Sequence, residues 1–365
     1  MNIRLTWRRA ALALGGVLAA GFLFAWSGLF HVGATGGHWA VTNWFLHWVM
    51  RNSVRTAALT VEAPPDLDDR ALVARAAGHY ATGCAPCHGA PGEKQNPVIA
   101  QSLPAPPDFS HALDPWSPQE LFVIVQQGVR YSGMPAWIEP MRRDEIWSVV
   151  AFLQRMPAMS SQDYQALSVG DGRPPGAGLH ALSAPAPEAV ADCARCHGRD
   201  GVGRDGDAFP IIAGQSEAYL LETLRAFAGG TRRSGMMQPA AARATDEDLQ
   251  GLAAHYAAQP RVAAPAPSVQ DAVLEEGGLI AREGIPLAQV PACLSCHGAA
   301  ALARNPAWPR LDGQHADYLE GQLAAWRDGA RGGGTQREVM ATVAERLTPG
   351  QARAVAAWFA SQPVR

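Results

Sequence analysis

The chain has 365 residues, of which 33 are acidic and 30 are basic, and its formal net charge is −3. The two signs of charge are interspersed and no short stretch concentrates basic residues, which argues against nucleic acid as a partner. The length corresponds to about three small domains and a tail.

The N-terminus carries an apolar segment that is long enough to cross a membrane. The run from Ala10 to Phe30 contains 21 residues and no charge, and three arginines precede it: Arg4, Arg8 and Arg9. As a helix, this run would span a hydrocarbon core and keep its basic end in the cytoplasm. A cleaved signal peptide is the alternative, because Val32-Gly33-Ala34 is an acceptable cleavage site, but its apolar region is usually about 7 to 15 residues. We therefore expect a retained anchor, with a helix at about 10–30, in a bacterial inner membrane.

A second aromatic segment follows at residues 38–50. It contains Trp39, Trp44 and Trp48, and the last two fall on one face of a helix. Such residues suit a membrane interface, so that residues 1–62 are expected to form the anchor and an interfacial segment. A stripe packed on the first domain and a docking surface for a membrane partner are the alternatives. Nearby histidines receive little weight as ligands, because each later unit supplies its own: His31, His38 and His47.

The sequence Cys-x-x-Cys-His occurs three times and uses all six cysteines. The copies are Cys84, Cys87 and His88; Cys193, Cys196 and His197; and Cys293, Cys296 and His297. This spacing is typical of c-type haem attachment, in which two thiols bridge the vinyl groups and the histidine ligates iron. A zinc site would need a second pair of ligands for each motif, and the sequence lacks such pairs. A disulfide framework would not explain why a histidine follows each cysteine pair. The motifs therefore predict three covalently bound haems c, on the periplasmic side where such haem is attached.

A methionine downstream of each motif is the expected second axial ligand. The candidates Met134, Met237 and Met340 follow their motif histidines by 46, 40 and 43 residues. Met340 has no competitor, whereas Met236 competes with Met237. We prefer Met237 because it precedes a Thr-led helix start at Ala244-Thr245 by seven residues, as Met340 does at Leu347-Thr348.

Met134 lies in a tight loop, Ser132-Gly133-Met134-Pro135, that can lean onto a haem face. The other methionines of this unit are expected in the core or at the surface: Met141, Met156 and Met159.

Each methionine is followed by a helical pattern. The apolar stripes are Ile146, Val149, Val150 and Leu153; Leu249, Leu252, Ala253 and Tyr256; and Ala352, Val355, Ala356 and Phe359. Thr245 with Asp248 and Thr348 with Gln351 are capping boxes that would start the last two helices. We expect domains at 66–167, 186–262 and 263–365, called here the first, second and third units, with linkers near 170–187 and 262–269.

The second and third units repeat each other. The corresponding segments are Phe209-Pro210, Gly214-Gln215 and Tyr219-Leu220 against Trp308-Pro309, Gly313-Gln314 and Tyr318-Leu319. On these motifs, residues from about 186 to 365 resemble the two-domain dihaem cytochromes c of the c-four class. The resemblance implies that Pro210 and Pro309 offer backbone carbonyls to the imidazoles of His197 and His297.

The first unit departs from this repeat. Its segments Tyr80–Gly89 and Gly133–Trp137 resemble the monohaem cytochrome c domains found fused to oxidases and dehydrogenases. The proline that supports its histidine is left open among Pro97, Pro104, Pro106 and Pro107. Together the resemblances imply an all-α protein with three class I cytochrome c domains in tandem after a transmembrane helix.

Electron transfer is the predicted function. A filled sixth position leaves no vacancy for oxygen or peroxide, so we expect no catalytic residue. The chain is predicted to be the cytochrome subunit that accepts electrons from a membrane-associated dehydrogenase. The alternative is a relay from a quinol-oxidising complex to a terminal oxidase. A haem enzyme such as a peroxidase would need a unit without its methionine.

Overall fold

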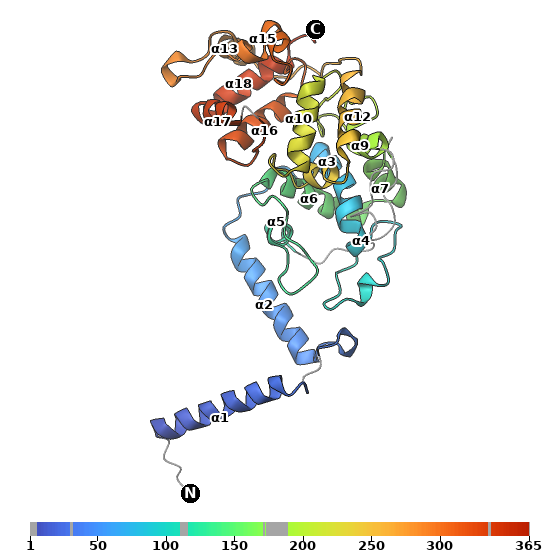
Figure 1. The fold of residues 1–365 in the computed structure, drawn as a ribbon, viewed down its shortest axis with the longest axis vertical. Coiled ribbons are helices and arrows are strands. Elements are labelled where there is room, and N and C mark those ends of the chain that lie inside the picture. The colour runs from blue at the N-terminus through green and yellow to red at the C-terminus, as the bar shows by residue number, and fades with distance from the viewer. Residues whose placement is uncertain are drawn as a thin grey trace.

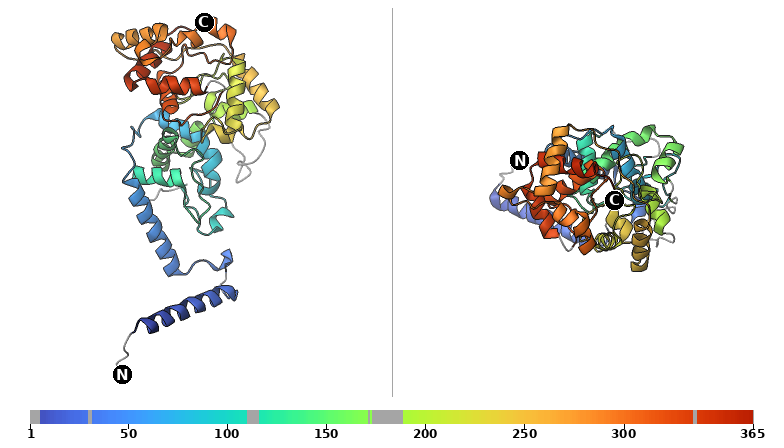
Figure 2. Two further views of the ribbon diagram at one scale, coloured as in Figure 1. Left: turned by 60° about the vertical axis from the view of Figure 1, so that its left-hand side comes forward. Right: turned by 90° about the horizontal axis from the view of Figure 1, so that it is seen from above.

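The computed structural model of the chain describes residues 6–29, 32–109, 116–170, 172, 189–334 and 337–364. Within these ranges the protein is helical and contains no β-strand, and two slender helices lead to a body that holds the three units (Figures 1 and 2). The helices are α1 Trp7–Trp26, α2 Ala40–Ala58, α3 Arg70–His79, α4 Ala85–His88, α5 Pro118–Gln127, α6 Arg143–Arg155, α7 Ser161–Ser168, α9 Ala189–His197, α10 Glu217–Ala228, α11 Met237–Ala241, α12 Asp246–Ala257, α13 Asp271–Glu283, α14 Leu294–His297, α15 Ala299–Arg304, α16 Ala316–Arg327, α17 Arg337–Arg346 and α18 Pro349–Ala360.

Helix α1 begins with Arg8 and Arg9 in its first turn, is apolar from Ala10 to Trp26 and has no buried residue. It has 20 residues, of which an 18-residue window has a mean hydropathy of 1.6, and at 1.5 Å per residue it is roughly 30 Å long, the thickness of a hydrocarbon core. The oxygen of Thr6 caps its start by accepting a hydrogen bond from the N–H of Arg9 at 3.4 Å. The helix begins a few residues before the predicted position and ends at Trp26, while Phe30 lies outside the described residues. A membrane anchor and a signal peptide both fit these properties.

Helix α2 exposes its N-terminal half and packs through its C-terminal half. Trp44 and Trp48 stack with their ring centroids 6.3 Å apart, and they are 64% and 54% exposed. Toward the C-terminal end, the guanidinium of Arg51 lies over the ring of Trp116 at 4.6 Å and Val54 is buried. The prediction that the two tryptophans share a face is confirmed, whereas the alternative that they pack on the first unit is wrong.

The core of the first unit is formed by α3, α5 and α6. The Tyr80 hydroxyl donates a hydrogen bond to the carbonyl of Gly89 at 2.7 Å, and its ring packs against Phe152 with centroids 5.0 Å apart. The predicted apolar stripe of α6 is buried throughout. The unassigned methionines also lie as predicted, with Met156 buried, Met159 packed against this core and Met141 half exposed.

The second and third units each pair a long helix with a capped one. Helix α10 packs against α12, and α16 packs against α18, which also packs against α13. Both predicted capping boxes are present, Thr245 with Asp248 and Thr348 with Gln351, each with the two reciprocal hydrogen bonds. The predicted apolar stripes of α12 and α18 are buried, so the helical patterns after the motifs are confirmed.

Direct contacts join the first unit to the second. Ala71 and Ala74 of α3 share a small apolar core with Ala208 and Phe209. The Nε of Arg75 donates a hydrogen bond to the carbonyl of Ala208 at 3.0 Å. Most of the expected linker at 170–187 lies outside the described residues, and the linker at 262–269 has no regular secondary structure.

We predict that Gly277→Ala destabilises the third unit by about 1–3 kcal/mol, because the methyl group would force two packed helices apart. A Cβ on Gly277 of α13 would lie 2.0 Å from the carbonyl oxygen of Ala354 in α18. Gly251→Ala in α12 is the matched control, since no atom lies within 4 Å of its added methyl; it should stabilise by about 0.5–1 kcal/mol through helix propensity. Thermal unfolding of the haem-loaded protein followed by circular dichroism checks both variants. Equal midpoints for the two would contradict the close approach of α13 and α18.

Candidate haem sites

The second Cys-x-x-Cys-His sequence forms the C-terminal end of α9, whereas Cys84 and Cys293 directly precede the four-residue helices α4 and α14. The three histidines His88, His197 and His297 are the last residues of α4, α9 and α14. Residues i, i+3 and i+4 share one face of a helix, so that the two thiols and the imidazole of each copy are presented on the same side. In the first unit a π-helical turn, Tyr80–Cys84, leads into the short helix α4.

The six cysteines are free thiols, and none forms a disulfide. Burial raises the pKa of Cys84 and Cys193 to about 12 and the pKa of Cys293 to about 11. In the described ranges, no group of three or more His, Cys, Asp or Glu side chains is placed to hold a metal ion. The thiols are therefore available for covalent attachment.

A proline carbonyl fixes the imidazole of His88. The Nδ1 atom of His88 lies 2.9 Å from the carbonyl oxygen of Pro107, so Nδ1–H donates and Nε2 is left for a ligand. The ring of Phe109 stacks on the imidazole with centroids 4.6 Å apart. Burial lowers the pKa of His88, which favours the neutral ring that a metal requires. Of the four prolines that the sequence leaves open, Pro107 makes this contact.

The two later histidines differ in the same contact. The Nδ1 of His297 lies 2.9 Å from the carbonyl oxygen of Pro309, as the resemblance implies. Burial lowers the pKa of His197 to about 4, and the carbonyl of Pro210 partly offsets this effect. The buried Nδ1 of His197 nevertheless has no partner within hydrogen-bonding distance and angle. The hydrogen bond expected from His197 to the Pro210 carbonyl is therefore not formed, and this carbonyl acts on the ring through its dipole alone.

The predicted methionines are half-buried, and two of them are held by a nearby serine. The N–H of Met134 donates to the hydroxyl oxygen of Ser132 at 3.1 Å, and the N–H of Met237 donates to that of Ser234 at 2.9 Å. Met237 is the first residue of α11 and Met340 lies in α17.

The neighbouring Met236 has a different environment from Met237. Its side chain packs against the core of the first unit. A side chain engaged there is not free to ligate an iron in the second unit, which supports the preference for Met237.

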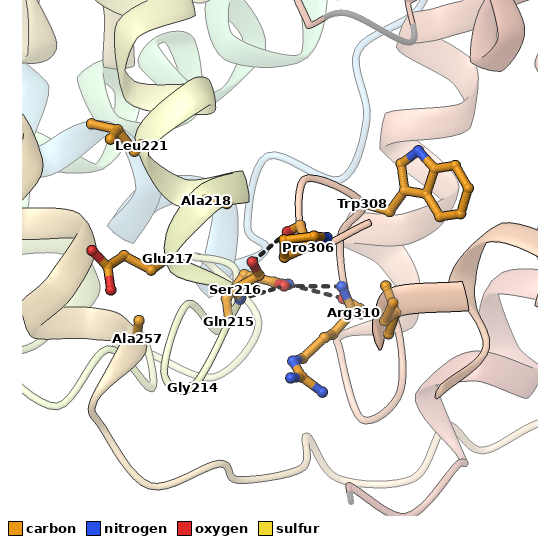
Figure 3. A pocket seen from close by; sticks show the side chains of 11 residues that line it. Gly214, Gln215, Ser216, Glu217, Ala218, Leu221, Ala257, Pro306, Trp308 and Arg310 are labelled. Carbon is orange, nitrogen blue, oxygen red and sulfur yellow. Dashed lines mark hydrogen bonds between the residues drawn. The ribbon is translucent and has the colours of Figure 1, made fainter. Parts of the chain in front are cut away.

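Two glutamines in corresponding positions join the second and third units. The Nε2 of Gln215 donates to the carbonyl of Arg310 at 3.0 Å, and its Oε1 accepts from the N–H of Arg310 at 2.9 Å (Figure 3). Gln314 makes the same pair of hydrogen bonds with Ile211, at 2.8 and 3.0 Å. A cavity of about 550 Å³ lies beside the first pair and is lined by residues of both units, none of them a predicted haem residue.

This arrangement links the two haem sites, because Ile211 and Arg310 directly follow Pro210 and Pro309. Each glutamine therefore holds the prolyl segment that lies beside the histidine of the other unit. The Gly-Gln repeat was visible in the sequence, but its role across the boundary was not.

The buried Arg232 and the half-buried Arg331 also meet at this boundary, and sequence reasoning missed them. Arg232 donates to the hydroxyl of Thr223 at 3.1 Å and to Oε1 of Gln322 at 3.2 Å, and Arg331 donates to the hydroxyl of Tyr219 at 3.4 Å. In the described part of the chain neither forms an ion pair with a carboxylate, and the Nε of Arg331 has no partner. Burial, and then the charge of Arg232, lowers the pKa of Arg331 to about 10. Their corresponding places in the repeat were the signal that could have found them.

Arg232 and Arg331 lie over the rings of Phe227 and Trp326 at 4.6 and 4.5 Å, and a guanidinium without a carboxylate partner favours an anionic ligand. Haem carries two carboxylate side chains. The arginines therefore fit haem, as do the free thiols and the Nε2 atoms of His88 and His297.

Comparison with known proteins agrees with this geometry. The family described as "Cytochrome C oxidase, cbb3-type, subunit III" matches residues 71–153 and 181–255. A protein named thiosulfate dehydrogenase electron acceptor, from Thiomonas intermedia, is 39% identical over 181 residues, which is 50% of this chain and 83% of that protein. The chain belongs to the cytochrome c family. A cytochrome c4 of Azotobacter vinelandii is 32% identical over 185 residues, 47% of this chain and 84% of that protein.

Among solved structures, reduced cytochrome c4 from Pseudomonas stutzeri is 29% identical to this cytochrome. The matched region covers 48% of this chain and 95% of the cytochrome c4 chain, with a TM-score of 0.43. On the 32% identity to the Azotobacter vinelandii protein, about half of this cytochrome is similar to cytochrome c4. Cytochromes c transfer electrons through covalently bound haem, and the three cysteine pairs of this chain fit three haems.

Proposed function

We propose that this cytochrome carries three His/Met-ligated haems c and acts in the periplasm as the electron acceptor of a membrane-associated dehydrogenase. The assignment of a dehydrogenase as the partner rests on one observation. The relative that is 39% identical over 83% of its length is named an electron acceptor of thiosulfate dehydrogenase. The proposed axial pairs are His88 with Met134, His197 with Met237, and His297 with Met340.

Different residues of the chain would attach each haem, orient its histidine and position its methionine. When bound, haem would supply one-electron exchange, and a histidine and a methionine of this chain would together leave no position open to oxygen or peroxide. The thiols fix the group covalently. The carbonyl of Pro107, and that of Pro309 in the third unit, orient the imidazole and raise its basicity. The serines at 132 and 234 hold the chain at the methionines.

A second candidate rests on a different observation. The family that matches residues 71–153 and 181–255 is described as a subunit of a cytochrome oxidase. This match favours a relay in which the chain takes electrons from a quinol-oxidising complex and delivers them to a terminal oxidase.

Reduction by the two classes of donor separates these functions. We predict that the oxidised haem-loaded protein is reduced by a purified thiosulfate dehydrogenase catalytic subunit in a thiosulfate-dependent way, seen as growth of the ferrous α-band. A quinol-oxidising complex with its quinol is the parallel arm, and omission of thiosulfate is the control. Reduction in the quinol arm alone would replace the first proposal by the second. Reduction in neither arm would contradict both.

Substitution tests the proposed methionines. We predict that Met340→Ala and Met237→Ala each remove one methionine's share of the weak ferric sulfur-to-iron band and lower the midpoint potential of one haem, because methionine ligation raises the potential. Met236→Ala is the matched control and should keep the whole band, since this side chain packs against the first unit. Loss of the band in Met236→Ala but not in Met237→Ala would exchange the two assignments.

We further propose that α1 is retained as an anchor and that α2 lies at the membrane surface. The support is the exposed length of α1 and the exposed aromatic side chains that follow it: Trp39, Trp44, Phe45 and Trp48. Tryptophans of this kind settle at the interface between lipid and water. The C-terminal half of α2 would then hold the first unit beside the membrane, through Arg51 on Trp116 and Arg55 beside Glu120 at 3.6 Å.

The mass of the mature protein tests the anchor. We predict that protein isolated from the membrane fraction retains residues 1–34 and needs detergent for extraction, since roughly 30 Å of apolar helix crosses the bilayer. Cleavage after Ala34 with release into the soluble periplasmic fraction would contradict the proposal. Cleavage with retention on the membrane would assign binding to α2, and Trp44→Ala with Trp48→Ala should then release the protein.

A further inference from the structure

The boundary between the first and second units is organised around one buried carboxylate. Glu145, in the first turn of α6, is 3% exposed. It accepts hydrogen bonds from the hydroxyl of Ser234 at 2.5 Å and from the N–H of Gly235 at 2.6 Å, both in the second unit. From its own unit it accepts the indole N–H of Trp137 at 3.3 Å, and it pairs with Arg142 at 2.9 Å. Both carboxylate oxygens are therefore used.

All four partners of Glu145 are donors, so the carboxylate is ionised in this arrangement. Burial and the charge of Asp144 keep its pKa above the ordinary value, although the charge of Arg142 and the hydrogen bonds from Ser234 and Gly235 lower it in part. A buried charge is costly unless it is fully paired, and removal of a partner leaves the rest of the network unsatisfied. The position is therefore one at which a single polar change has a large structural effect.

Ser234 connects Glu145 to the backbone at Met237. The same Ser234 hydroxyl that donates to Glu145 accepts hydrogen bonds from the N–H groups of Met237 at 2.9 Å and Met236 at 3.3 Å. Ser234 is 2% exposed, so water does not compete for these bonds. The orientation of the hydroxyl, and with it the start of α11, is set by a residue of the first unit.

Glu145 is also hydrogen-bonded to Trp137, in the segment that carries Met134. Trp137 follows Met134 by three residues and is 8% exposed. Its indole lies so close to Gly235 that a Cβ at this glycine would be 2.2 Å from the ring. The segments that carry two proposed axial methionines thus touch each other directly, with Glu145 hydrogen-bonded to both.

Arg142 and Arg233 extend the contact. The guanidinium of Arg142 donates to the carbonyl of Arg233 at 2.9 Å, and the N–H of Arg233 donates to the carbonyl of Arg331 in the third unit at 2.6 Å. The segment before Met237 is therefore held from both neighbouring units.

We propose that Glu145 of the first unit is a positioning residue for the haem of the second unit, because it fixes the segment that presents Met237 to the iron. The proposal rests on the proposed function in one respect, the ligation of that iron by Met237. The redox properties of the second haem then depend on attachment of the first unit, which an isolated two-domain cytochrome of this class lacks.

Glu145→Gln in the full-length, haem-loaded protein is the primary test. The amide keeps the size of the side chain but replaces one acceptor by a donor that faces other donors. We expect a weakened sulfur-to-iron band and a lower midpoint potential for one haem, while the other two haems keep their potentials. Glu120→Gln is the matched control, because Glu120 is also in the first turn of a helix of the first unit, where it caps α5 and neighbours Arg55. It should leave all three potentials and the band unchanged.

Ser234→Ala approaches the same link from the second unit and keeps the proposal testable if Glu145→Gln does not fold. It should reproduce the change in band and potential. In the double variant the effects should be far from additive, because both substitutions break one chain of hydrogen bonds. A merely structural role for Glu145 would lower the unfolding midpoint and leave the band and the potentials unchanged, which would overturn the proposal.

Met237→Ala separates this proposal from the one on which it rests. If Met237→Ala leaves the band intact, the ligation is wrong and the positioning role falls with it. If Met237→Ala removes its share of the band while Glu145→Gln and Ser234→Ala do not affect it, the ligation stands and the positioning role alone is refuted.

Discussion

A buried polar group that finds no partner costs about 1–3 kcal/mol, and this cost governs how the three units are joined. Gln215 and Gln314 are buried at one boundary and Glu145 at the other, and each finds its partners across that boundary. Several of these partners are backbone groups, which cannot move without their segment. Sliding of one unit on another would therefore break several hydrogen bonds at once, so the spacing between the candidate haem sites is fixed.

The two boundaries are built differently. Between the second and third units the same contact occurs twice, since Gln215 and Gln314 hold Arg310 and Ile211 in the same way. Between the first and second units the contacts differ from one another, since Glu145 accepts from Ser234, Arg142 donates to the carbonyl of Arg233 and Arg75 donates to the carbonyl of Ala208. The repeated contact accompanies the sequence repeat of the c4-like half. The first unit lacks that repeat, and its contacts with the second involve Ser234, Gly235 and Ala208 as well as Phe209 of the shared motif.

Features that depend on neighbouring residues could be predicted from the sequence. The motif Cys-x-x-Cys-His, the capping box of Thr245 and the stripe of α12 each lie within one helix, and the structure bears out the cap and the stripe. Glu145 and Ser234 are 89 residues apart, and a glutamate in the first turn of a helix resembles any exposed acid in the sequence. The choice of Pro107 likewise depends on the path of a loop, which local pattern does not encode.

The arrangement along the long axis bears on the direction of electron flow. Helix α2 attaches to α5 of the first unit, and the c4-like half lies beyond it, away from α1 (Figures 1 and 2). If α1 is the anchor, the first unit is the one nearest to the membrane, while the third unit faces the periplasm. A redox partner that approaches from the periplasm would then meet the c4-like half first. A membrane-bound acceptor would meet the first unit. Electrons would then pass from the c4-like half to the first unit across the boundary that Glu145 organises.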